Sequence, residues 1–379
     1  MVASMEALAQ AVRERAEGLG FDLVGFAPAA PFERERELIL EDLARGHLTG
    51  MSWITADRVR LSCDPEALLP GVRTIVALGT AYARPEPQVE NAGLRGRVAR
   101  YAWSRDYHDV VPPKLRTLAA EIVGLAGKET RCRTFVDTGP LVDRAAAERA
   151  GVGFVGKNTC VLTGRFGSYV LLSAILTTAE ISTEHVAQRD CGSCQLCLDA
   201  CPTDAFVGPR QLDATRCISY LTIEHRGPIP IPLRSQIGSW VFGCDVCQEV
   251  CPWNRARPFA AHEELAPETG VGANLDLVEL FDLDDAAFRQ RFRGTPLTRA
   301  KRSGLLRNAA VVLGNLGDPV AIPSLAHALD DVDPLVRRHA AWALGQLGEK
   351  SSEAPSALRA KLAAETDPDV MEELLAALQ

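Results

Sequence analysis

Two short stretches decide how this chain folds: CGSCQLCLDACP at residues 191–202 and CDVCQEVCP at residues 244–252. The first stretch carries four cysteines, the second carries three, and one more cysteine lies between them at position 217. Such short and regular spacing of thiols is typical of a loop that wraps around a metal centre. A proline follows the last cysteine of each run and turns the chain away from that ligand.

The spacing C-x-x-C-x-x-C-x-x-x-C-P is that of bacterial proteins with two [4Fe–4S] clusters, in which the fourth cysteine of a run ligates the other cluster. Eight thiolates are the number that two such clusters need. We therefore predict two ligand sets. The first cluster takes Cys191, Cys194, Cys197 and Cys251, and the second takes Cys201, Cys217, Cys244 and Cys247. Structural zinc is the alternative, because C-x-x-C pairs also bind zinc.

The composition predicts a cytoplasmic monomer with no membrane anchor. Three cysteines, Cys63, Cys132 and Cys160, remain outside the ligand sets and are widely spaced, so we interpret them as buried apolar residues rather than a disulfide framework. Thiolate ligands and unpaired thiols indicate a reducing compartment. The first 20 residues are interrupted by Glu and Arg, unlike an export signal, and the longest apolar run is too short to span a bilayer.

The charge is unevenly distributed. A net charge of −8 argues against nucleic acid as a default partner, yet residues 289–307 hold seven Arg or Lys and no acid. Residues 95–116 hold six basic side chains against two acids. Basic islands on an acidic protein are typical of a phosphate-binding face. A solvated helix surface is the alternative, and from composition alone it is the simpler one.

Apolar periodicity upstream of the cysteines predicts a layered domain. Strands are expected at 23–26, 74–78, 134–136 and 168–176, between helices at 5–18, 31–45, 113–126 and 141–150. This alternation predicts an α/β (α+β) domain at 1–185, followed by a ferredoxin-like two-cluster domain at 186–260. Clusters only carry electrons, so a domain of this size implies a second cofactor or a substrate site. Asp137 follows the third strand and is a candidate proton donor.

One glycine pattern points to a function that we exclude. Gly151, Gly153 and Gly156 spell G-x-G-x-x-G, the fingerprint of dinucleotide-binding folds. That fingerprint needs a strand before it and a helix after it. Here the preceding segment is helical and the following one is strand-like, so we predict no NAD site.

The C-terminal segment, residues 261–379, contains an internal repeat. LLRNAAVVLGNLGDP, from Leu305, is echoed by VRRHAAWALGQLGEK, from Val336, at a period of 31 residues. A third copy begins at Asp367. Helix pairs with such a period form HEAT-like repeats, which bury their apolar faces only by stacking. Such a tail usually binds something large, but it could also simply cap the core.

Several segments together resemble the epoxyqueuosine reductases along nearly the whole chain. They are LLPGVRTIVALGTAY (68–82), RYAWSRDYHDVV (100–111), FVDTGPLVDRAAAERAGVGFVGKNT (135–159), RFGSYVLLSAILT (165–177), CISYLTIEHRGPIP (217–230) and GSWVFGCDVCQEVCPWN (238–254). The last is the most specific, because it joins a cluster motif to the Trp-Asn ending of that family.

The resemblance implies a cobalamin-dependent oxidoreductase of queuosine biosynthesis. Such an enzyme reduces epoxyqueuosine to queuosine at the wobble position of a tRNA anticodon, in the last step of the pathway. Two [4Fe–4S] clusters, fed by an external electron donor, supply the cob(I/II)alamin, which is bound by the N-terminal domain next to one cluster.

The resemblance also implies roles for individual residues. Asp137 matches the family's proton donor, and His225 and Arg226 match contacts to the anticodon stem-loop. The candidate corrinoid contacts are Arg60, Lys157, Asn158, Thr159, Ser219, Thr222 and Asp245.

Two other functions stay open at this point. A reductive dehalogenase-like enzyme would share cobalamin and two clusters, but that class typically has a twin-arginine export signal and lacks a HEAT-like tail. A ferredoxin-type electron carrier with a partner-binding solenoid would bind no corrinoid and would not depend on Asp137.

Overall fold

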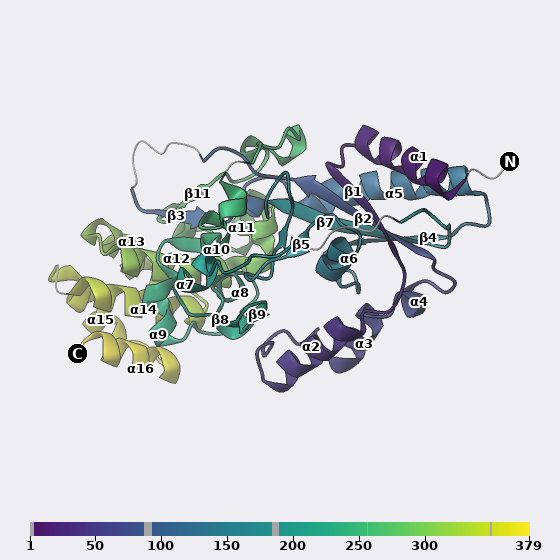
Figure 1. The fold of residues 1–379 in the computed structure, drawn as a ribbon. Helices are drawn as coiled ribbons and strands as arrows, with labels where there is room; N and C mark the ends of the chain where they lie inside the picture. Colours follow the sequence, from purple (N-terminus) through teal and green to yellow (C-terminus); the bar gives the residue numbers. More distant parts are fainter. Residues whose placement is uncertain (1–3, 87–92, 184–188, 256, 349–350) are drawn as a thin grey trace. The chain divides into compact units, whose positions relative to one another are not determined.

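The computed structural model describes residues 4–86, 93–183, 189–255, 257–348 and 351–379 (Figure 1). The chain forms two compact units, each assembled from three separate segments. The sheet unit comprises Met1–Pro85, Arg105–Thr215 and Val246–Ala266, and the repeat unit comprises Glu86–Ser104, Arg216–Asp245 and Pro267–Gln379. The predicted domain boundary between residues 185 and 186 lies outside the described residues.

A four-stranded sheet forms the centre of the sheet unit. Its strand order is β1 (Leu23–Pro28), β2 (Thr74–Ala81), β7 (Val170–Thr177) and β4 (Cys132–Val136). All three pairings are antiparallel, so α+β describes this sheet better than α/β. Every residue of β2 is buried, as expected for a central strand that is covered on both faces.

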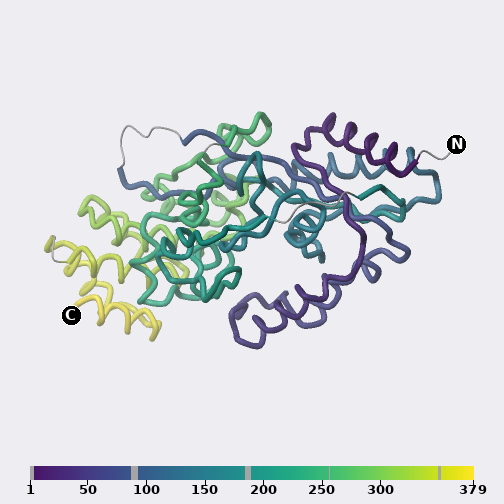
Figure 2. The backbone as a smooth tube through the Cα atoms, in the orientation of Figure 1, coloured from purple at the N-terminus to yellow at the C-terminus, as the bar shows by residue number. Residues whose placement is uncertain are grey.

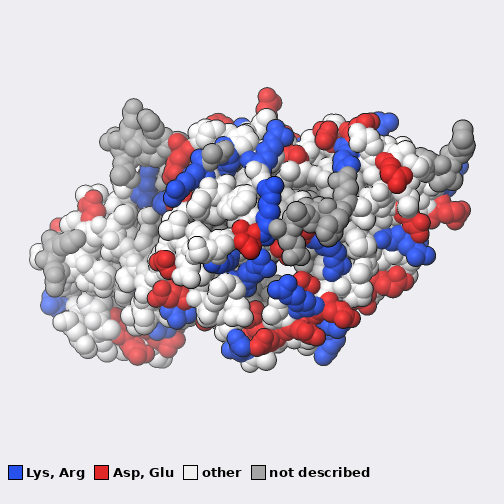
Figure 3. Space-filling view, in the orientation of Figure 1, with Lys and Arg blue, Asp and Glu red and all other residues white. Residues whose placement is uncertain are grey.

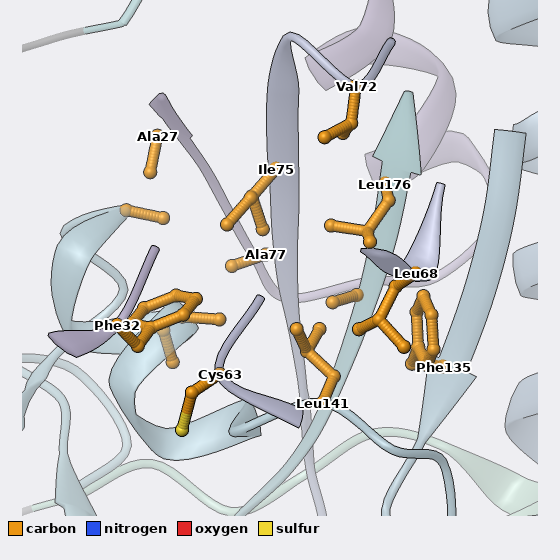
Figure 4. Close-up of a cluster of buried hydrophobic side chains, with 14 of the residues drawn as sticks. Ala27, Phe32, Cys63, Leu68, Val72, Ile75, Ala77, Phe135, Leu141 and Leu176 are labelled. Atoms are coloured by element: carbon orange, nitrogen blue, oxygen red, sulfur yellow. The ribbon is translucent and has the colours of Figure 1, made fainter. Parts of the chain in front are cut away.

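The two faces of the sheet are covered by different helices. Helices α1 (Met5–Gly18) and α5 (Tyr107–Ala126) run side by side along one face, and α6 (Asp143–Arg149) lies on the other (Figures 1 and 2). On the α6 face, Ile75 and Ala77 of β2 meet Phe135 and Leu176 in a core that also contains the Cys63 thiol (Figure 4). The predicted burial is therefore confirmed for Cys63, whereas Cys132 and Cys160 are only partly buried.

Gly25 of β1 allows α6 to pack closely on the sheet. A Cβ atom built on Gly25 would lie 2.1 Å from the carbonyl oxygen of Ala150, the residue that ends α6. Real Cβ atoms do not approach backbone oxygens this closely, so any other residue here would push the helix outward. This packing fixes α6 on the sheet, and α6 is the helix that follows the loop containing Asp137.

Helix α5 begins six residues before its predicted start at residue 113. Asp106 caps it by accepting a hydrogen bond from the His108 amide at 3.0 Å. The apolar spacing of Leu115, Leu118 and Ile122 predicts only the later part of this helix, from residue 113. The helix instead includes both Pro112 and Pro113. Neither proline can donate a backbone hydrogen bond. The burial of Leu115, Leu118 and Ile122 on one face of the helix compensates for this loss.

The remaining elements of the sheet unit are short. They comprise α2 (Glu33–Ala44), α3 (Ala56–Ser62), α4 (Pro65–Leu68), α7 (Leu196–Asp199), α10 (Val246–Glu249), a hairpin of β5 (Phe154–Val155) and β6 (Val161–Leu162), and a hairpin of β8 (Phe206–Gly208) and β9 (Gln211–Leu212). The glycine pattern at 151–156 leads from α6 into the β5–β6 hairpin, which is the reverse of the dinucleotide-binding order.

The repeat unit combines a small sheet with five stacked helices. In the sheet, β3 (Arg95–Val98) pairs in parallel with β10 (Trp240–Phe242) and antiparallel with β11 (Asn274–Asp276). The other helices, α8 (Ile218–Ile223), α9 (Ile231–Arg234) and α11 (Asp285–Arg291), precede the stack. The stack comprises α12 (Lys301–Leu316), α13 (Ile322–Ala328), α14 (Pro334–Leu347), α15 (Glu353–Leu362) and α16 (Pro368–Ala377) (Figure 2).

Local sequence explains where the helices of the predicted repeats begin and how closely they pack. Asp333 and Asp367 cap α14 and α16, and in each case proline follows at the first helical position. Gly314 and Gly345 occupy equivalent places, where added Cβ atoms would meet Trp342 at 2.7 Å and Ala377 at 2.9 Å. These two glycines let successive long helices approach closely, and the predicted helical repeats are confirmed.

Among the described residues, no helix has both the length and the apolar character needed to cross a bilayer.

Candidate iron–sulfur and catalytic sites

Four predicted cluster ligands meet in the sheet unit. Cys191, Cys194 and Cys197 lie in the loop leading into α7 and in its first turn, and Cys251 follows α10. These four thiols, the predicted first set, line one cavity of about 180 Å³. The donor set consists of thiols alone, which suits a [4Fe–4S] cluster.

The four thiols lie close enough to influence one another. Burial, together with negative charge on Cys191, Cys251 and Cys194, raises the pKa of the Cys197 thiol to about 11. Burial likewise raises the pKa of Cys251. Without a cation, Cys197 and Cys251 therefore resist ionisation. A bound metal cluster would supply the positive charge that four thiolates need.

The β5–β6 hairpin forms an apolar wall beside this cavity. Phe154 and Leu162 pack with Cys251, and the rings of Phe154 and Trp253 meet edge to face at 5.1 Å. Leu162 and Trp253 also line the cavity. An apolar wall limits the access of water to a cluster, and solvent exposure is one determinant of cluster potential.

The turn of the same hairpin supplies polar groups. The Nζ atom of Lys157 donates to the carbonyl oxygens of Gly192 and Cys194, both at 2.8 Å. The amide of Asn158 donates to the Cys247 carbonyl at 3.3 Å. Two candidate corrinoid contacts are therefore bonded to the loops that carry cluster ligands.

The predicted second ligand set is divided between the units. Cys201 and Cys247 belong to the sheet unit, where the Cys201 thiol accepts a hydrogen bond from the Ala205 amide at 3.3 Å. Cys217 and Cys244 belong to the repeat unit, where Cys217 precedes α8 and Cys244 follows β10. This ligand set stays a prediction.

Asp137 stands at the end of β4 in an unusual backbone conformation. Its φ angle is +46°, in the left-handed region that non-glycine residues seldom adopt. Its side chain is 58% exposed. The Tyr107 hydroxyl donates to its Oδ2 atom at 2.5 Å, and Nε2 of His108 lies 3.7 Å from the same oxygen. The fold therefore presents this carboxyl outward while holding it from the start of α5.

Sequence reasoning missed the residues that surround Asp137. The His108 ring contacts Asp106 through Nδ1 at 3.0 Å, so Asp106, His108 and Asp137 form a continuous polar row. Their signal was present in RYAWSRDYHDVV, where an acid, a tyrosine and a histidine are consecutive. Only the pairing of α5 with the end of β4 gives that triplet a role.

A second carboxyl lies near Asp137. Burial, and after it the negative charge of Asp137, raises the pKa of Asp143 to about 8. Among the described residues, no hydrogen-bond partner reaches its buried Oδ1 atom. Asp143 therefore keeps its proton at neutral pH, which removes the cost of burying a charge at the start of α6.

The other candidate corrinoid contacts are distributed over both units. In the sheet unit, Arg60 is exposed and pairs with Asp57 at 2.7 Å, and the Thr159 carbonyl accepts from Arg144 at 2.9 Å. Helix α2, next to α3, carries further pairs of this kind, and Figure 3 shows acidic and basic side chains interspersed over this part of the surface.

In the repeat unit, Ser219, Thr222 and Asp245 all take part in hydrogen bonds that involve a backbone group. The Thr222 hydroxyl donates to the Ile218 carbonyl at 2.7 Å, and the Ser219 carbonyl lies 3.4 Å from that hydroxyl. The buried Asp245 carboxylate accepts from the Arg100 amide at 2.7 Å.

The candidate tRNA contacts lie in the loop after α8. The His225 ring contacts the Pro228 carbonyl at 3.0 Å, and burial lowers the pKa of this histidine. The Arg226 guanidinium donates to the Ile223 carbonyl at 3.1 Å.

The basic stretch 289–307 does not act as one surface. Arg302 pairs with Asp331 at 2.5 Å, and Arg307 is fully buried. The side chains of Arg289, Arg291, Arg293 and Lys301 are exposed, although Arg291 also pairs with Glu279 at 3.0 Å. Two of the seven basic residues, Arg302 and Arg307, therefore stabilise the repeat unit itself and are not available to a phosphate-binding face.

Comparison with family models defines the class of protein. Residues 190–254 match the 4Fe-4S double cluster binding domain, and residues 297–379 match HEAT repeats. The chain is therefore a two-cluster iron–sulfur protein with a helical-repeat tail, and iron–sulfur clusters rather than zinc are its metal cofactors. The predicted ferredoxin-like and HEAT-like parts of the fold are confirmed.

A third model and individual relatives define the family. Residues 63–138 match the model described as epoxyqueuosine reductase QueG, DUF1730. An epoxyqueuosine reductase of Pseudomonas aeruginosa is 40% identical over 348 residues, covering 90% of this chain and 95% of its own. The chain belongs to the epoxyqueuosine reductase family, and it is an oxidoreductase.

Solved structures of that family share the fold. An epoxyqueuosine reductase crystallised with an epoxyqueuosine-modified tRNA-Tyr stem loop superimposes with a TM-score of 0.90, at 34% identity and over 98% of both chains. A second, from Bacillus subtilis, superimposes with a TM-score of 0.89, at 33% identity and over 98% of both chains. In that structure, a catalytic loop that carries an aspartate has swung out of the active site.

Replacing one cavity cysteine should remove one cluster. We expect Cys197→Ser to reduce the iron content of anaerobically reconstituted protein from about eight to about four per chain, because each cube needs its thiolates. Iron analysis together with electron paramagnetic resonance of the reduced protein measures this loss. Cys160→Ser is the matched control, since Cys160 is partly buried but does not line the cavity, and it should retain the full iron content.

The protonated Asp143 should make stability depend on pH. The pKa of Asp143 rises from 3.8 to about 8 on folding, so between these values the folded chain binds more protons than the unfolded chain. Stability from this site therefore falls as the pH rises through that window. We expect Asp143→Asn to raise the melting temperature relative to wild type more at pH 8 than at pH 5. In Asp57→Asn, whose carboxyl is 94% exposed, this difference should not change with pH. A pH-independent effect of Asp143→Asn would contradict the assignment.

Proposed function

We propose that this protein reduces epoxyqueuosine to queuosine at the wobble position of tRNA anticodons. The observation that carries the proposal is the polar group of Asp137, Tyr107 and His108, which lies in the same unit as the cavity lined by four thiols. The reaction consumes two electrons and two protons. The epoxide oxygen leaves as water, and an alkene remains in the ring.

Cobalamin is the second cofactor in this proposal. When bound, it supplies a low-potential cobalt that passes electrons from the clusters to the substrate. Arg60, which is exposed on α3, and Thr159 offer polar groups suited to the amide and phosphate groups around a corrin ring. Lys157 and Asn158 are bonded to the cluster loops, which favours a corrinoid position beside a cluster. Ser219, Thr222 and Asp245 complete the proposed contacts.

Asp137 is the proposed proton donor to the epoxide oxygen. An epoxide oxygen is a poor leaving group until it is protonated, and a positioned acid contributes about 10²- to 10⁴-fold. Its exposed carboxyl can reach a substrate, while Tyr107 fixes its orientation. His108 and Asp106 extend the polar row and provide a path for the next proton.

The loop that carries Asp137 is suited to movement. Its positive φ angle stores backbone strain, which is common in parts of a site that move. The swung-out catalytic loop of the Bacillus subtilis relative supports the proposal that this loop opens and closes around the substrate.

The substrate base would be presented by the anticodon stem-loop. His225 and Arg226 are the proposed contacts near the base, and the exposed basic residues in the last turn of α11 and just after it would contact phosphates. A wobble base must leave its stack to enter an active site, which single-stranded loops allow at low cost. The tRNA-bound relative supports this partner. An external donor would reduce the clusters in the cytoplasm, where the protein would act as a monomer.

Removing the proposed acid should abolish turnover without removing the cofactors. We expect Asp137→Asn to lower the single-turnover rate on an epoxyqueuosine-containing stem-loop by about 10²- to 10⁴-fold, with iron and cobalt retained. Tyr107→Phe should cause a smaller loss, because the acid remains but is less well oriented. Mass spectrometry of the nucleoside measures conversion. Asp109→Asn, an exposed change on the first turn of α5, is the control. Undiminished reduction by Asp137→Asn would exclude Asp137 as the proton donor.

Binding of tRNA should depend on salt through a few exposed arginines. We expect Arg289→Gln combined with Arg293→Gln to reduce the slope of log affinity against log salt by about 1.4 to 1.8, since each phosphate contact contributes about 0.7 to 0.9. Fluorescence anisotropy with a labelled stem-loop between low and physiological salt measures the slope. The control combines Arg34→Gln with Lys128→Gln, two exposed positions of the sheet unit. Equal slopes for the two double variants would show that Arg289 and Arg293 do not contact phosphates.

A further inference from the structure

The stacked helices of the repeat unit carry a row of buried polar side chains that face their own chain. Arg307 and Asn308 of α12 and His339 of α14 have no exposed surface. Asn315 lies two turns beyond Asn308 on α12 and is partly buried. Buried polar groups must find hydrogen-bond partners. All four find them in one segment, residues 221–241, which lies some 70 to 110 positions away in sequence.

Arg307 binds three backbone carbonyls in this segment. Its guanidinium donates to the oxygens of Leu221 at 2.5 Å, His225 at 2.9 Å and Gly227 at 2.7 Å. Its remaining bonds go to Asn308. Burial lowers the pKa of Arg307 to about 9, and among the described residues no carboxylate is bonded to it. Burying a cation without a carboxylate partner costs free energy. The contacts of Arg307 therefore fix the backbone conformation of this segment rather than adding the stability of an ion pair.

Asn308 and Asn315 continue the same pattern. The Asn308 amide donates to the Thr222 carbonyl at 2.8 Å and to the Val241 carbonyl at 2.9 Å. The Asn315 amide donates to the carbonyls of Arg234 at 2.9 Å and Gly238 at 3.0 Å. Asn308 thus bridges two backbone points that lie 19 residues apart, whereas Asn315 joins two that lie four residues apart.

His339 contacts the middle of residues 221–241. Its Nε2 atom accepts a hydrogen bond from the Ile229 amide at 3.1 Å. It occupies the place in its repeat that Asn308 occupies one repeat earlier, since the two are 31 residues apart. Arg234 within the segment adds a buried ion pair with Glu373 of α16, at 2.7 Å. The segment is therefore contacted by the first, third and fifth helices of the stack.

The clasped segment is directly connected to functional positions. Cys217 is the residue before α8, and Arg307 and Asn308 bind carbonyls of the last turns of that helix. The hydroxyl of Thr222 accepts a hydrogen bond from the amide of Gly243 at 2.9 Å, and Gly243 precedes Cys244. His225 and Arg226 lie within the clasped loop itself.

We propose that the HEAT-like repeats act as an internal clasp for residues 221–241, and that this clasp positions Cys217 and Cys244 together with the His225–Arg226 loop. Helical repeats commonly use rows of polar side chains to bind the backbone of a partner. Here that row is occupied by the chain itself, so the tail shapes the site instead of recruiting another protein. The consequences for the second cluster and for tRNA rest on the proposed function, whereas the clasp itself does not.

Arg307→Met tests the clasp, with Arg337→Met as its matched control. The Arg337 guanidinium is also largely buried, but its bonds go to Glu365, Asp331 and Val332, all within the stack. Hydrogen exchange measured by mass spectrometry on the metal-free protein should show about tenfold to hundredfold faster exchange in residues 218–242 for Arg307→Met only. After reconstitution, its iron content should fall from about eight towards four while the first cluster persists.

A milder variant keeps the test decisive if Arg307→Met does not fold. Asn315→Ala removes two hydrogen bonds at a partly buried position and should accelerate exchange in residues 234–238. Unchanged exchange in the segment would overturn the clasp. Faster exchange with a full iron content would overturn its role in positioning Cys217 and Cys244. Because exchange is read without tRNA or cobalamin, a failure of the clasp and a failure of the proposed reductase activity are distinguishable.

Discussion

The need to bring Cys251 into the cavity of the preceding cysteine run governs the path of this chain. Three thiols come from one short loop, but the fourth lies 54 residues beyond Cys197 in the sequence. The chain therefore leaves the sheet unit at Thr215, contributes residues 216–245 to the repeat unit, and returns at Val246. The segment between the two cysteine runs does not line this cavity, and it carries Cys217, His225 and Arg226.

Hydrogen bonds from side chains to backbone atoms organise much of both regions. The Lys157 ammonium donates to two carbonyls of the cysteine loop. The Arg307 guanidinium donates to three carbonyls at the end of α8 and in the loop that follows it. Such contacts are directional and depend on backbone shape, so they hold a loop in one conformation. A loop that positions metal ligands needs this kind of constraint more than it needs added stability.

Much of the architecture could be read before the structure was known. The strands and helices of the sheet unit lie within a few residues of their expected positions, because alternating and 3.6-residue apolar patterns report burial directly. The start of α5 was the exception, since the apolar spacing that predicts this helix begins at Leu115 while the helix itself begins at Tyr107. For the basic stretch 289–307, the sequence left both a phosphate-binding face and a solvated surface open. Composition counts charges, but it does not distinguish the exposed Arg289 from the buried Arg307.

The sequence by itself determined the class of cofactor, the helical repeats and the family, because each of these depends on spacing between residues that are near neighbours in the chain. The surroundings of Asp137 and the clasp of residues 221–241 were decided only by tertiary structure. Tyr107 is 30 residues from Asp137, and Arg307 is 86 residues from Leu221. No local pattern encodes such pairs. They form because α5 packs against the end of β4, and because stacked helices bury a row of polar groups that must be satisfied by whatever backbone lies against them.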